Sequence, residues 1–372
     1  MSVANLLGYP AIVLAFLSHR LLTGSPWEPE ITFLLAAIGV IPLAQLMGEA
    51  TEEIAARVGP TWGGLLNATF GNAAELIIGV IALLKGLNDV VKASLTGSIL
   101  GNLLLIAGGA MLVGGWHRDQ QRFSPKAAEA NAGLLTIAVA AMLCPAIFHF
   151  TAEHMHDRHL GEHEFGVSLG TSIILIAIYA LGLLFSLRTH KHLFCTGPRR
   201  DGYQGPGWGV RRSVLLLLAA SVGVALVAEL LVGSAQAVAD GFGWNPIFVG
   251  VILLAIIGNA AEHSTALRLA RANDMETAMT ITYQSSLQIA LFVTPVLVFV
   301  SAFMEWFGVG TTSGHLDLVF TPLEVVSVML TVSTVVVLLA DGRTNWFEGT
   351  LLLGLYLILG VAFYFMPAPG GP

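Results

Sequence analysis

Two glutamates stand inside apolar stretches of this chain, and each closes the same five-residue motif. The motif GNAAE begins at Gly71 and again at Gly258, so it ends on Glu75 and on Glu262. A charged side chain at the centre of a membrane helix costs about 2.5–3.5 kcal/mol on insertion scales, and such residues usually serve a function. No Lys or Arg lies at comparable depth in either stretch. Each carboxylate must therefore be neutralised by something else.

A pair of facing carboxylates can be neutralised in two ways. One divalent cation or two protons would each cancel the charge of the pair, and the two loads exclude each other. Carboxylates that share a site raise each other's affinity for protons, and a hard cation such as Ca²⁺ takes oxygen ligands. We therefore expect Glu75 and Glu262 to form one site that holds either Ca²⁺ or protons. The empty pair carries two negative charges and is too costly to enclose within the protein. Only the pair loaded with Ca²⁺ or with protons would change sides, so one ion would cross only in exchange for the other.

Further polar side chains lie close to the two motifs. An amide precedes each glutamate by three residues, and the following apolar stretches carry a hydroxyl at the same spacing, together with more amides. These candidate ligands are Asn72, Asn259, Ser98, Ser285, Asn102 and Gln288. Each of them could equally be a hydrogen bond between packed helices. Met and Cys are missing from this polar set, which argues against a soft metal.

Five more acidic residues could act as a gate or on a proton path. Glu49, Glu52 and Glu53 lie one turn apart near the end of the second apolar stretch, where they could collect cations or simply form an exposed, helix-capping turn. Glu229 and Glu324 lie deeper, in the seventh and tenth stretches. Each of these two could carry a proton or make a hydrogen bond to a neighbouring helix.

The composition indicates an all-α polytopic membrane protein. The chain is 55% hydrophobic and 11% charged, with a mean hydropathy of +0.77, whereas soluble domains are about a quarter charged. Spans of about 20 apolar residues, separated by Gly, Pro and charged clusters, predict eleven transmembrane helices. They centre on 5–19, 31–50, 62–84, 93–115, 127–149, 165–187, 213–238, 245–268, 276–303, 319–340 and 346–366.

The basic residues predict the orientation in the membrane. Of the 17 Lys and Arg, 13 border the loops on one side of the predicted helices. Basic loops stay in the cytoplasm, so we expect a cytoplasmic N-terminus and, with an odd number of helices, a C-terminus outside. The lipid bilayer is then the principal partner. The net charge of −7 is scattered along the chain, so we expect no nucleic-acid partner.

The repeated motif is part of a longer internal repeat. An offset of 187 residues, the separation of Gly71 and Gly258, aligns Gly63 with Gly250, Asn72 with Asn259, Glu75 with Glu262, and Ser98 with Ser285. A match that stays in register across two helices is not expected by chance. Because each unit has five helices, the two units should be inverted, with a site between them near the bilayer midplane. The predicted organisation is an N-terminal helix outside the repeat (1–30), a first repeat (31–190), a cytoplasmic linker (191–212) and a second repeat (213–372).

Other functional classes fit less well. An intramembrane hydrolase would need a metal motif such as HExxH or a pair of aspartates in facing helices, and the sequence has neither. We therefore expect a transporter, not an enzyme, with no cofactor besides the transported ions. A cation channel is the remaining rival, but a single carboxylate pair between inverted repeats suits a transporter better than a ring-lined pore. The sequence leaves a homo-oligomer open.

Several stretches resemble one family closely. GLLNATFGNAAELI at Gly64 and GVILLAIIGNAAEHSTAL at Gly250 are similar to the two signature repeats of the cation/proton exchangers, a branch of the calcium/cation antiporter superfamily. SLTGSILGNLLLIAGG, SSLQIALFVTPVLV, LDLVFTPLEVV and LADGRTNWFEGTLLL also resemble stretches of that family. The resemblance implies eleven helices and Ca²⁺ extrusion driven by a proton gradient. It also implies that Glu75 and Glu262 form the shared site, and His263 matches the same branch.

The chain departs from the family pattern at two positions and in one loop. Gln284 stands where Gly is expected, and Gly101 stands where Ser is expected, which puts the cation geometry and selectivity in question. Exchange of Na⁺ or K⁺ for protons on the same scaffold is therefore the alternative. The loop CTGPRRDGYQGPGWGVRR lacks the acidic helix of some eukaryotic members, which favours a prokaryotic plasma membrane.

Overall fold

The chain folds almost entirely into helices. The computed structural model describes residues 3–189, 207–309 and 314–367, so most of the predicted linker, 191–212, lies outside the described residues. Within them, two short strands, β1 (Gln121–Arg122) and β2 (Arg343–Thr344), pair antiparallel. The prediction of an all-α membrane protein is confirmed.

The helices and the π-helical segments, marked η, follow each other along the chain. The first half contains α1 (Val3–Leu21), α2 (Glu28–Val58), α3 (Pro60–Phe70), α4 (Ala73–Leu84), α5 (Asn88–Leu100), η1 (Gly101–Ile106), α6 (Ala107–Gly115), α7 (Pro125–His154), α8 (Leu160–Leu184) and η2 (Phe185–Thr189). The second half contains α10 (Val210–Phe242), α11 (Pro246–Phe248), η3 (Val249–Leu254), α12 (Ala255–Gly258), α13 (Ala260–Arg271), α14 (Met275–Gln288), η4 (Ile289–Val293), α15 (Thr294–Trp306), α16 (Pro322–Leu339) and α17 (Trp346–Tyr364).

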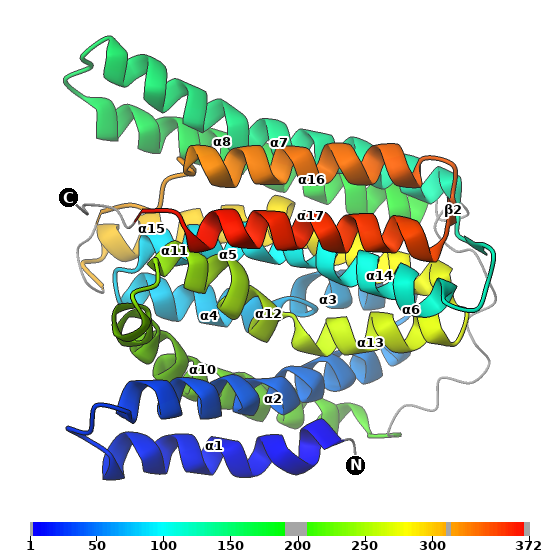
Figure 1. The fold of residues 1–372 in the computed structure, drawn as a ribbon, viewed down its shortest axis with the longest axis horizontal. Coiled ribbons are helices and arrows are strands. Elements are labelled where there is room, and N and C mark those ends of the chain that lie inside the picture. The colour runs from blue at the N-terminus through cyan, green and yellow to red at the C-terminus, as the bar shows by residue number, and fades with distance from the viewer. Residues whose placement is uncertain (1–2, 190–206, 310–313, 368–372) are drawn as a thin grey trace.

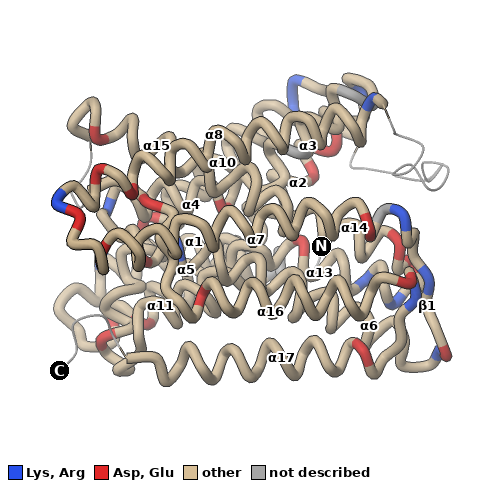
Figure 2. The backbone as a smooth tube through the Cα atoms, turned by 90° about the horizontal axis from the view of Figure 1, so that it is seen from above, with Lys and Arg blue, Asp and Glu red and all other residues tan. Residues whose placement is uncertain are grey.

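The long helices are apolar enough to cross a membrane. Among the described residues, eight helices meet this condition, and a bent pair of helices raises the number to nine. One shorter apolar helix, Ala73–Leu84, does not reach the length of a span by itself. The predicted number of eleven is therefore not confirmed. Charged residues gather toward the two ends of the helices and are sparse between them (Figure 2).

The two ends of the bundle are distinct. We call the end that carries β1 and β2 the ribbon end, and the end where α7 turns into α8 the hairpin end. The chain starts α1 toward the ribbon end and finishes α17 at the hairpin end (Figure 1). The start of α1 and the end of α17 therefore lie toward opposite ends of the bundle, as an odd number of crossings requires. Which end faces the cytoplasm stays a prediction.

The two motif-bearing stretches are broken helices. We expected Glu75 and Glu262 in the middle of a span, but each lies in the first turn of a helix that starts after a break. In the second stretch, Pro246–Gly258 and Ala260–Arg271 meet at an angle of 61°. Asn72 (φ −105°, ψ 28°) and Asn259 (φ −91°, ψ 5°) stand at the two breaks. Asn favours such non-helical, helix-starting positions because its short amide competes with the helix hydrogen bonds.

The two halves share further local features. The π-helical segments η1 and η4 follow α5 and α14, the helices that carry Ser98 and Ser285. The α3–α4 pair and the α12–α13 pair run in opposite directions along the bundle (Figure 1). Both observations agree with an inverted repeat. The residue boundaries of the two repeats stay a prediction.

Helix α5 crosses η3 at a very short distance. A Cβ atom built on Gly97 would lie 2.0 Å from the carbonyl oxygen of Val251, and one built on Gly250 would lie 2.6 Å from Cβ of Ala93. Small residues allow such close backbone contact between membrane helices. The crossing holds the hairpin-end half of the second broken helix against α5.

We expect Gly97→Val to destabilise the fold because any side chain would push α5 away from η3. Overpacking of this kind costs about 1–3 kcal/mol. The thermal unfolding midpoint of the detergent-solubilised protein would measure the loss. Gly101→Ala is the matched control, since a Cβ atom there meets nothing within 4 Å. Equal midpoints for the two variants would contradict the close crossing.

Candidate functional site

The two GNAAE motifs meet at the centre of the bundle. A Cβ atom built on Gly258 would lie 3.5 Å from Cγ of Glu75, so the first glutamate lies against the start of the second motif. The carboxylates of Glu75 and Glu262 are close enough for the charge of one to act on the other. The structure thus brings together the two residues that the sequence singled out.

Each of the two carboxylates has one oxygen that makes no hydrogen bond to the described residues. Among the described residues, Oε2 of Glu75 and Oε2 of Glu262 are buried without a hydrogen-bond partner, and no salt bridge reaches either residue. A buried charged group without a partner is costly. Both oxygens therefore keep lone pairs available for a cation or a proton.

A layer of polar side chains surrounds the glutamates. All seven of the predicted supporting residues are buried, with at most 9% of each exposed: Asn72, Ser98, Asn102, Asn259, His263, Ser285 and Gln288. They come from the two helix breaks, from α5 with η1, from α13 and from α14. The structure therefore brings the whole predicted set into one region.

Asn102 is the centre of this layer. Its Nδ2 donates to Ser285 Oγ at 2.8 Å and to Asn259 Oδ1 at 3.3 Å. Its Oδ1 lies 3.3 Å from Nε2 of His263. Both sides of the amide are thus in use, which fixes the orientation of the side chain. The adjoining backbone is π-helical, a distortion that is frequent at functional sites.

The remaining bonds between members of the layer also join the two halves of the chain. Asn259 Nδ2 donates to Ser98 Oγ at 2.9 Å, and Asn72 Nδ2 donates to Gln288 Oε1. The Ser285 hydroxyl lies 3.4 Å from Asn72 Oδ1 and within hydrogen-bonding reach of Glu262. Every side-chain bond of the layer that links two of its members crosses from the first half to the second. The site therefore exists only where the halves meet.

The donor set suits a hard cation. Apart from the two glutamates, it consists mainly of amide and hydroxyl oxygens, and the described residues contain no cluster of three or more His, Cys, Asp and Glu side chains. Oxygen ligands are the preference of Ca²⁺, whereas zinc and copper sites draw on His and Cys. The last carbonyls of a helix have no partner within it, so α3 and α12 end with further oxygens near the breaks.

The three acidic residues of α2 lie apart from this layer. Glu49 and Glu52 are exposed near the ribbon end. Glu49 interacts electrostatically with Arg268 of α13. Glu53 is 4% exposed, pairs with Arg57 and accepts a hydrogen bond from the backbone N–H of Gly207 at 3.2 Å. Glu53 thus joins the end of α2 to the backbone that leads into α10.

The two deeper acids are not brought to the centre either. Glu229 lies on the exposed face of α10, in line with Leu226 and Val222. Glu324 is 2% exposed at the start of α16, where it forms a capping box with Thr321 and accepts a hydrogen bond from Thr96 Oγ1 at 3.2 Å. Thr96 was not among the residues singled out by sequence. Its spacing of two residues from Ser98 is the only signal that could have pointed to it.

Comparison with known proteins agrees with this site. The sodium/calcium exchanger protein family matches residues 30–188 and 212–365. A Ca²⁺/H⁺ antiporter of Synechocystis is 42% identical, and the match covers 95% of each chain. The Ca²⁺/H⁺ antiporter ChaA of Bacillus subtilis is 40% identical over 96% of this chain and 97% of its own.

Solved structures show the same architecture. The structure of native YfkE superposes with a TM-score of 0.80 at 37% identity, and the match covers 98% of this chain and 100% of that one. The H⁺/Ca²⁺ exchanger CAX superposes with a TM-score of 0.64 at 11% identity, over 97% of this chain and 93% of its own, which shows a shared fold. The chain therefore belongs to the sodium/calcium exchanger protein family, and within it to the cation/proton exchangers.

Proposed function

We propose that this protein is a secondary antiporter that exchanges Ca²⁺ for protons across a membrane. The observation that carries the proposal is the meeting of Glu75 and Glu262, each with one buried oxygen that has no partner among the described residues. The surrounding amide and hydroxyl groups add oxygen ligands of the kind that Ca²⁺ takes. Relatives named as Ca²⁺/H⁺ antiporters, 40–43% identical over most of the chain, support the same pair of substrates.

The coupling follows from the electrostatics of the pair. Two facing carboxylates are neutral overall when they hold one Ca²⁺ or two protons, and strongly charged when they hold neither. Moving an uncompensated charge through the low-dielectric interior is costly, so only the loaded forms can change sides. A proton gradient then drives Ca²⁺ in the opposite direction.

Alternating access needs two conformations, and an inverted repeat supplies them. We propose an N-terminal helix (1–30), repeats at 31–190 and 213–372, and a linker at 191–212. The aligned glycines pack differently: Gly250 meets α5, whereas a Cβ atom on Gly63 would lie 2.4 Å from the Ala55 carbonyl of α2. The two repeats are therefore not packed identically.

The ribbon end is the cytoplasmic end in this proposal. Most Lys and Arg belong to the loops on that side, and basic loops remain in the cytoplasm. The protein would then lie in the plasma membrane, with the N-terminus inside and the C-terminus outside. Glu49 and Glu52, exposed near the ribbon end, would meet cytoplasmic cations first.

Two alternatives can be separated by ion flux. A Na⁺/H⁺ or K⁺/H⁺ antiporter on the same scaffold would move protons against Na⁺ or K⁺ and would not need Ca²⁺. A cation channel would pass current without proton movement. The single carboxylate pair and the inverted arrangement favour an antiporter over a channel. The relatives named as Ca²⁺/H⁺ antiporters favour Ca²⁺ over Na⁺ or K⁺.

Replacing either glutamate should abolish exchange. In proteoliposomes with an imposed pH gradient, Glu75→Gln and Glu262→Gln should each reduce Ca²⁺ uptake to the level of empty liposomes, because one carboxylate alone cannot neutralise Ca²⁺. Glu129→Gln, an exposed position on α7, is the control and should transport normally. Full uptake with both glutamates replaced, or uptake without a pH gradient, would refute the mechanism.

Protons should compete with Ca²⁺ for the same site. Lowering the pH on the side from which Ca²⁺ loads should raise the KM for Ca²⁺ several-fold and leave the maximal rate unchanged, because saturating Ca²⁺ displaces the protons. Initial rates across a series of Ca²⁺ concentrations, with the opposite side buffered at constant pH, would measure both quantities. A lower maximal rate at constant KM would indicate separate sites.

A further inference from the structure

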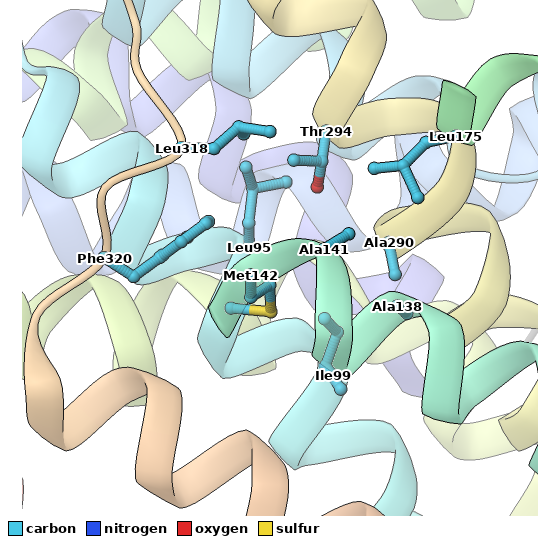
Figure 3. A pocket seen from close by; sticks show the side chains of 10 residues that line it. All are labelled: Leu95, Ile99, Ala138, Ala141, Met142, Leu175, Ala290, Thr294, Leu318 and Phe320. Carbon is cyan, nitrogen blue, oxygen red and sulfur yellow. The ribbon is translucent and has the colours of Figure 1, made fainter. Parts of the chain in front are cut away.

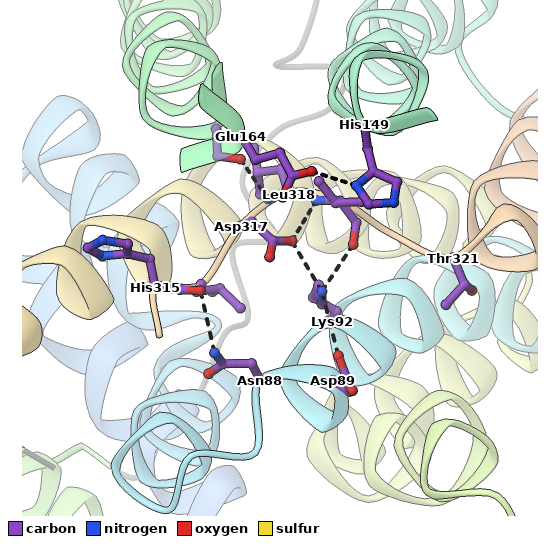
Figure 4. Close-up of polar contacts among 12 residues, drawn as sticks. Asn88, Asp89, Lys92, His149, Glu164, His315, Asp317, Leu318 and Thr321 are labelled. Carbon is purple, nitrogen blue, oxygen red and sulfur yellow. Dashed lines mark hydrogen bonds and ion pairs between the residues drawn. The ribbon is translucent and has the colours of Figure 1, made fainter. Parts of the chain in front are cut away.

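One face of α5 is bonded to the segment that leads into α16. Asn88 Nδ2 lies 3.4 Å from the carbonyl oxygens of both Gly314 and His315. Lys92 Nζ donates to Asp317 Oδ1 at 3.1 Å and to the carbonyl oxygen of Val319 at 3.0 Å (Figure 4). One turn further along α5, Thr96 donates to Glu324. We call the three α5 residues Asn88, Lys92 and Thr96, which recur every four positions, the α5 seam.

The bonded segment is itself held firmly. The backbone N–H of Leu316 donates to Ser301 Oγ of α15 at 2.7 Å, and that of Leu318 donates to Ser168 Oγ of α8 at 2.9 Å. The His315 ring stacks on Phe165 with centroids 3.8 Å apart. The α5 seam therefore ties α5 to a part of the bundle that other helices already fix.

On the side of α5 away from η3, the apolar packing is incomplete. A small apolar cavity lies beside it, lined by Leu95 and Ile99 of α5, by Leu318 and Phe320 of the bonded segment, and by residues of α7, α8, η4 and α15 (Figure 3). Side chains next to a void lose part of their van der Waals contacts. Directional bonds on the α5 seam restrain the register of the helix on this side, in addition to its close crossing with η3.

The matching face in the second half is built differently. The offset of 187 that aligns Ser98 with Ser285 also aligns the three residues of the α5 seam with apolar or aromatic residues. Asn88, Lys92 and Thr96 align with Met275, Met279 and Tyr283, in that order. These three side chains of α14 are at most 3% exposed. On this face, α14 packs through apolar side chains, whereas α5 makes hydrogen bonds and an ion pair. Lys92 is also costly to bury, with only 14% of its side chain exposed.

We propose that Lys92, with Asp317, and Glu324 are positioning residues that hold Ser98 and Asn102 in place for the cation. Ser98 follows Thr96 by two residues and lies about 9 Å from Lys92 along the helix. A shift of α5 would move the Ser98 hydroxyl away from Asn259 and disturb the bonds of Asn102. The inference rests on the proposed Ca²⁺/H⁺ exchange, and it gives Glu324 a structural role instead of that of a proton carrier.

Transport kinetics can test the ion pair. We expect Lys92→Met and Asp317→Asn each to raise the KM for Ca²⁺ about tenfold at unchanged kcat, which corresponds to about 1.4 kcal/mol at 25 °C. The double variant should be no worse than the single variants, because the two act through one interaction. Asp89→Asn is the matched control: Asp89 lies 3.6 Å from Lys92 but on α5 itself, so its loss leaves the tie between elements intact. Lys92→Arg keeps the charge and should keep the KM.

The Glu324 variants separate positioning from proton transfer. Glu324→Gln can still bond to Thr96 and Thr321 but cannot release a proton, so KM and the number of protons exchanged per Ca²⁺ should remain as in the wild type. Glu324→Leu should raise the KM as Lys92→Met does. A changed proton number in Glu324→Gln would overturn the positioning role.

Other outcomes are equally distinct. If the wild type exchanges Ca²⁺ for protons but Lys92→Met and Asp317→Asn keep its KM, the positioning role is wrong and the exchange stands. If the wild type itself shows no proton-driven Ca²⁺ uptake, the proposed function fails first. A normal elution profile in size-exclusion chromatography would show that each variant is folded. If Lys92→Met misfolds, Asp317→Asn and Glu324→Gln still decide the question.

Discussion

A carboxylate inside a membrane protein must be neutralised, and the centre of this structure is organised around that requirement. Glu75 and Glu262 lie next to each other at the breaks of two helices, and each keeps one buried oxygen without a partner among the described residues. A fixed basic side chain would neutralise them permanently. Among the described residues, no salt bridge reaches either glutamate. Exchangeable ions must therefore neutralise them.

The breaks in the two helices follow from the same requirement. A continuous helix would bury its backbone groups in its own hydrogen bonds and present only side chains to an ion. At Asn72 and Asn259 the helices stop and start again, so helix ends with free backbone groups come close to the carboxylates. The start of a helix carries partial positive charge, which offsets part of the cost of the ionised glutamates. Discontinuous helices at the midplane are a general solution in transporters.

The polar layer connects the halves more than it stabilises either one. Its side-chain bonds run from Asn72, Ser98 and Asn102 to residues of the second half. Hydrogen bonds within membranes are individually modest in strength. A network of weak, directional bonds across the interface can hold the ligands in a defined geometry and still rearrange when the halves move.

Patterns in the sequence alone indicate the membrane class, the internal repeat and the two glutamates that meet at the centre. Apolar stretches, the repeated GNAAE motif and the aligned Ser98 and Ser285 are all local patterns, readable at a fixed spacing. All seven supporting side chains predicted from it are buried around the glutamates. The orientation in the membrane and the repeat boundaries stay predictions. Contacts within the protein depend neither on which side of the membrane is cytoplasmic nor on the residue at which a repeat begins.

The features that depend on contacts between distant segments became visible only in the folded structure. Hydropathy could not reveal the helix breaks, since Gly71, Asn72 and their neighbours fit an unbroken apolar span. The predicted depth in the membrane was similar for Glu229 and Glu324, so it could not distinguish their environments. Glu229 is exposed on α10, whereas Glu324 is buried in the capping box of α16. The Lys92–Asp317 pair joins residues 225 positions apart. A single sequence carries spacing but no distances, so contacts between remote segments appear only when the helices are packed.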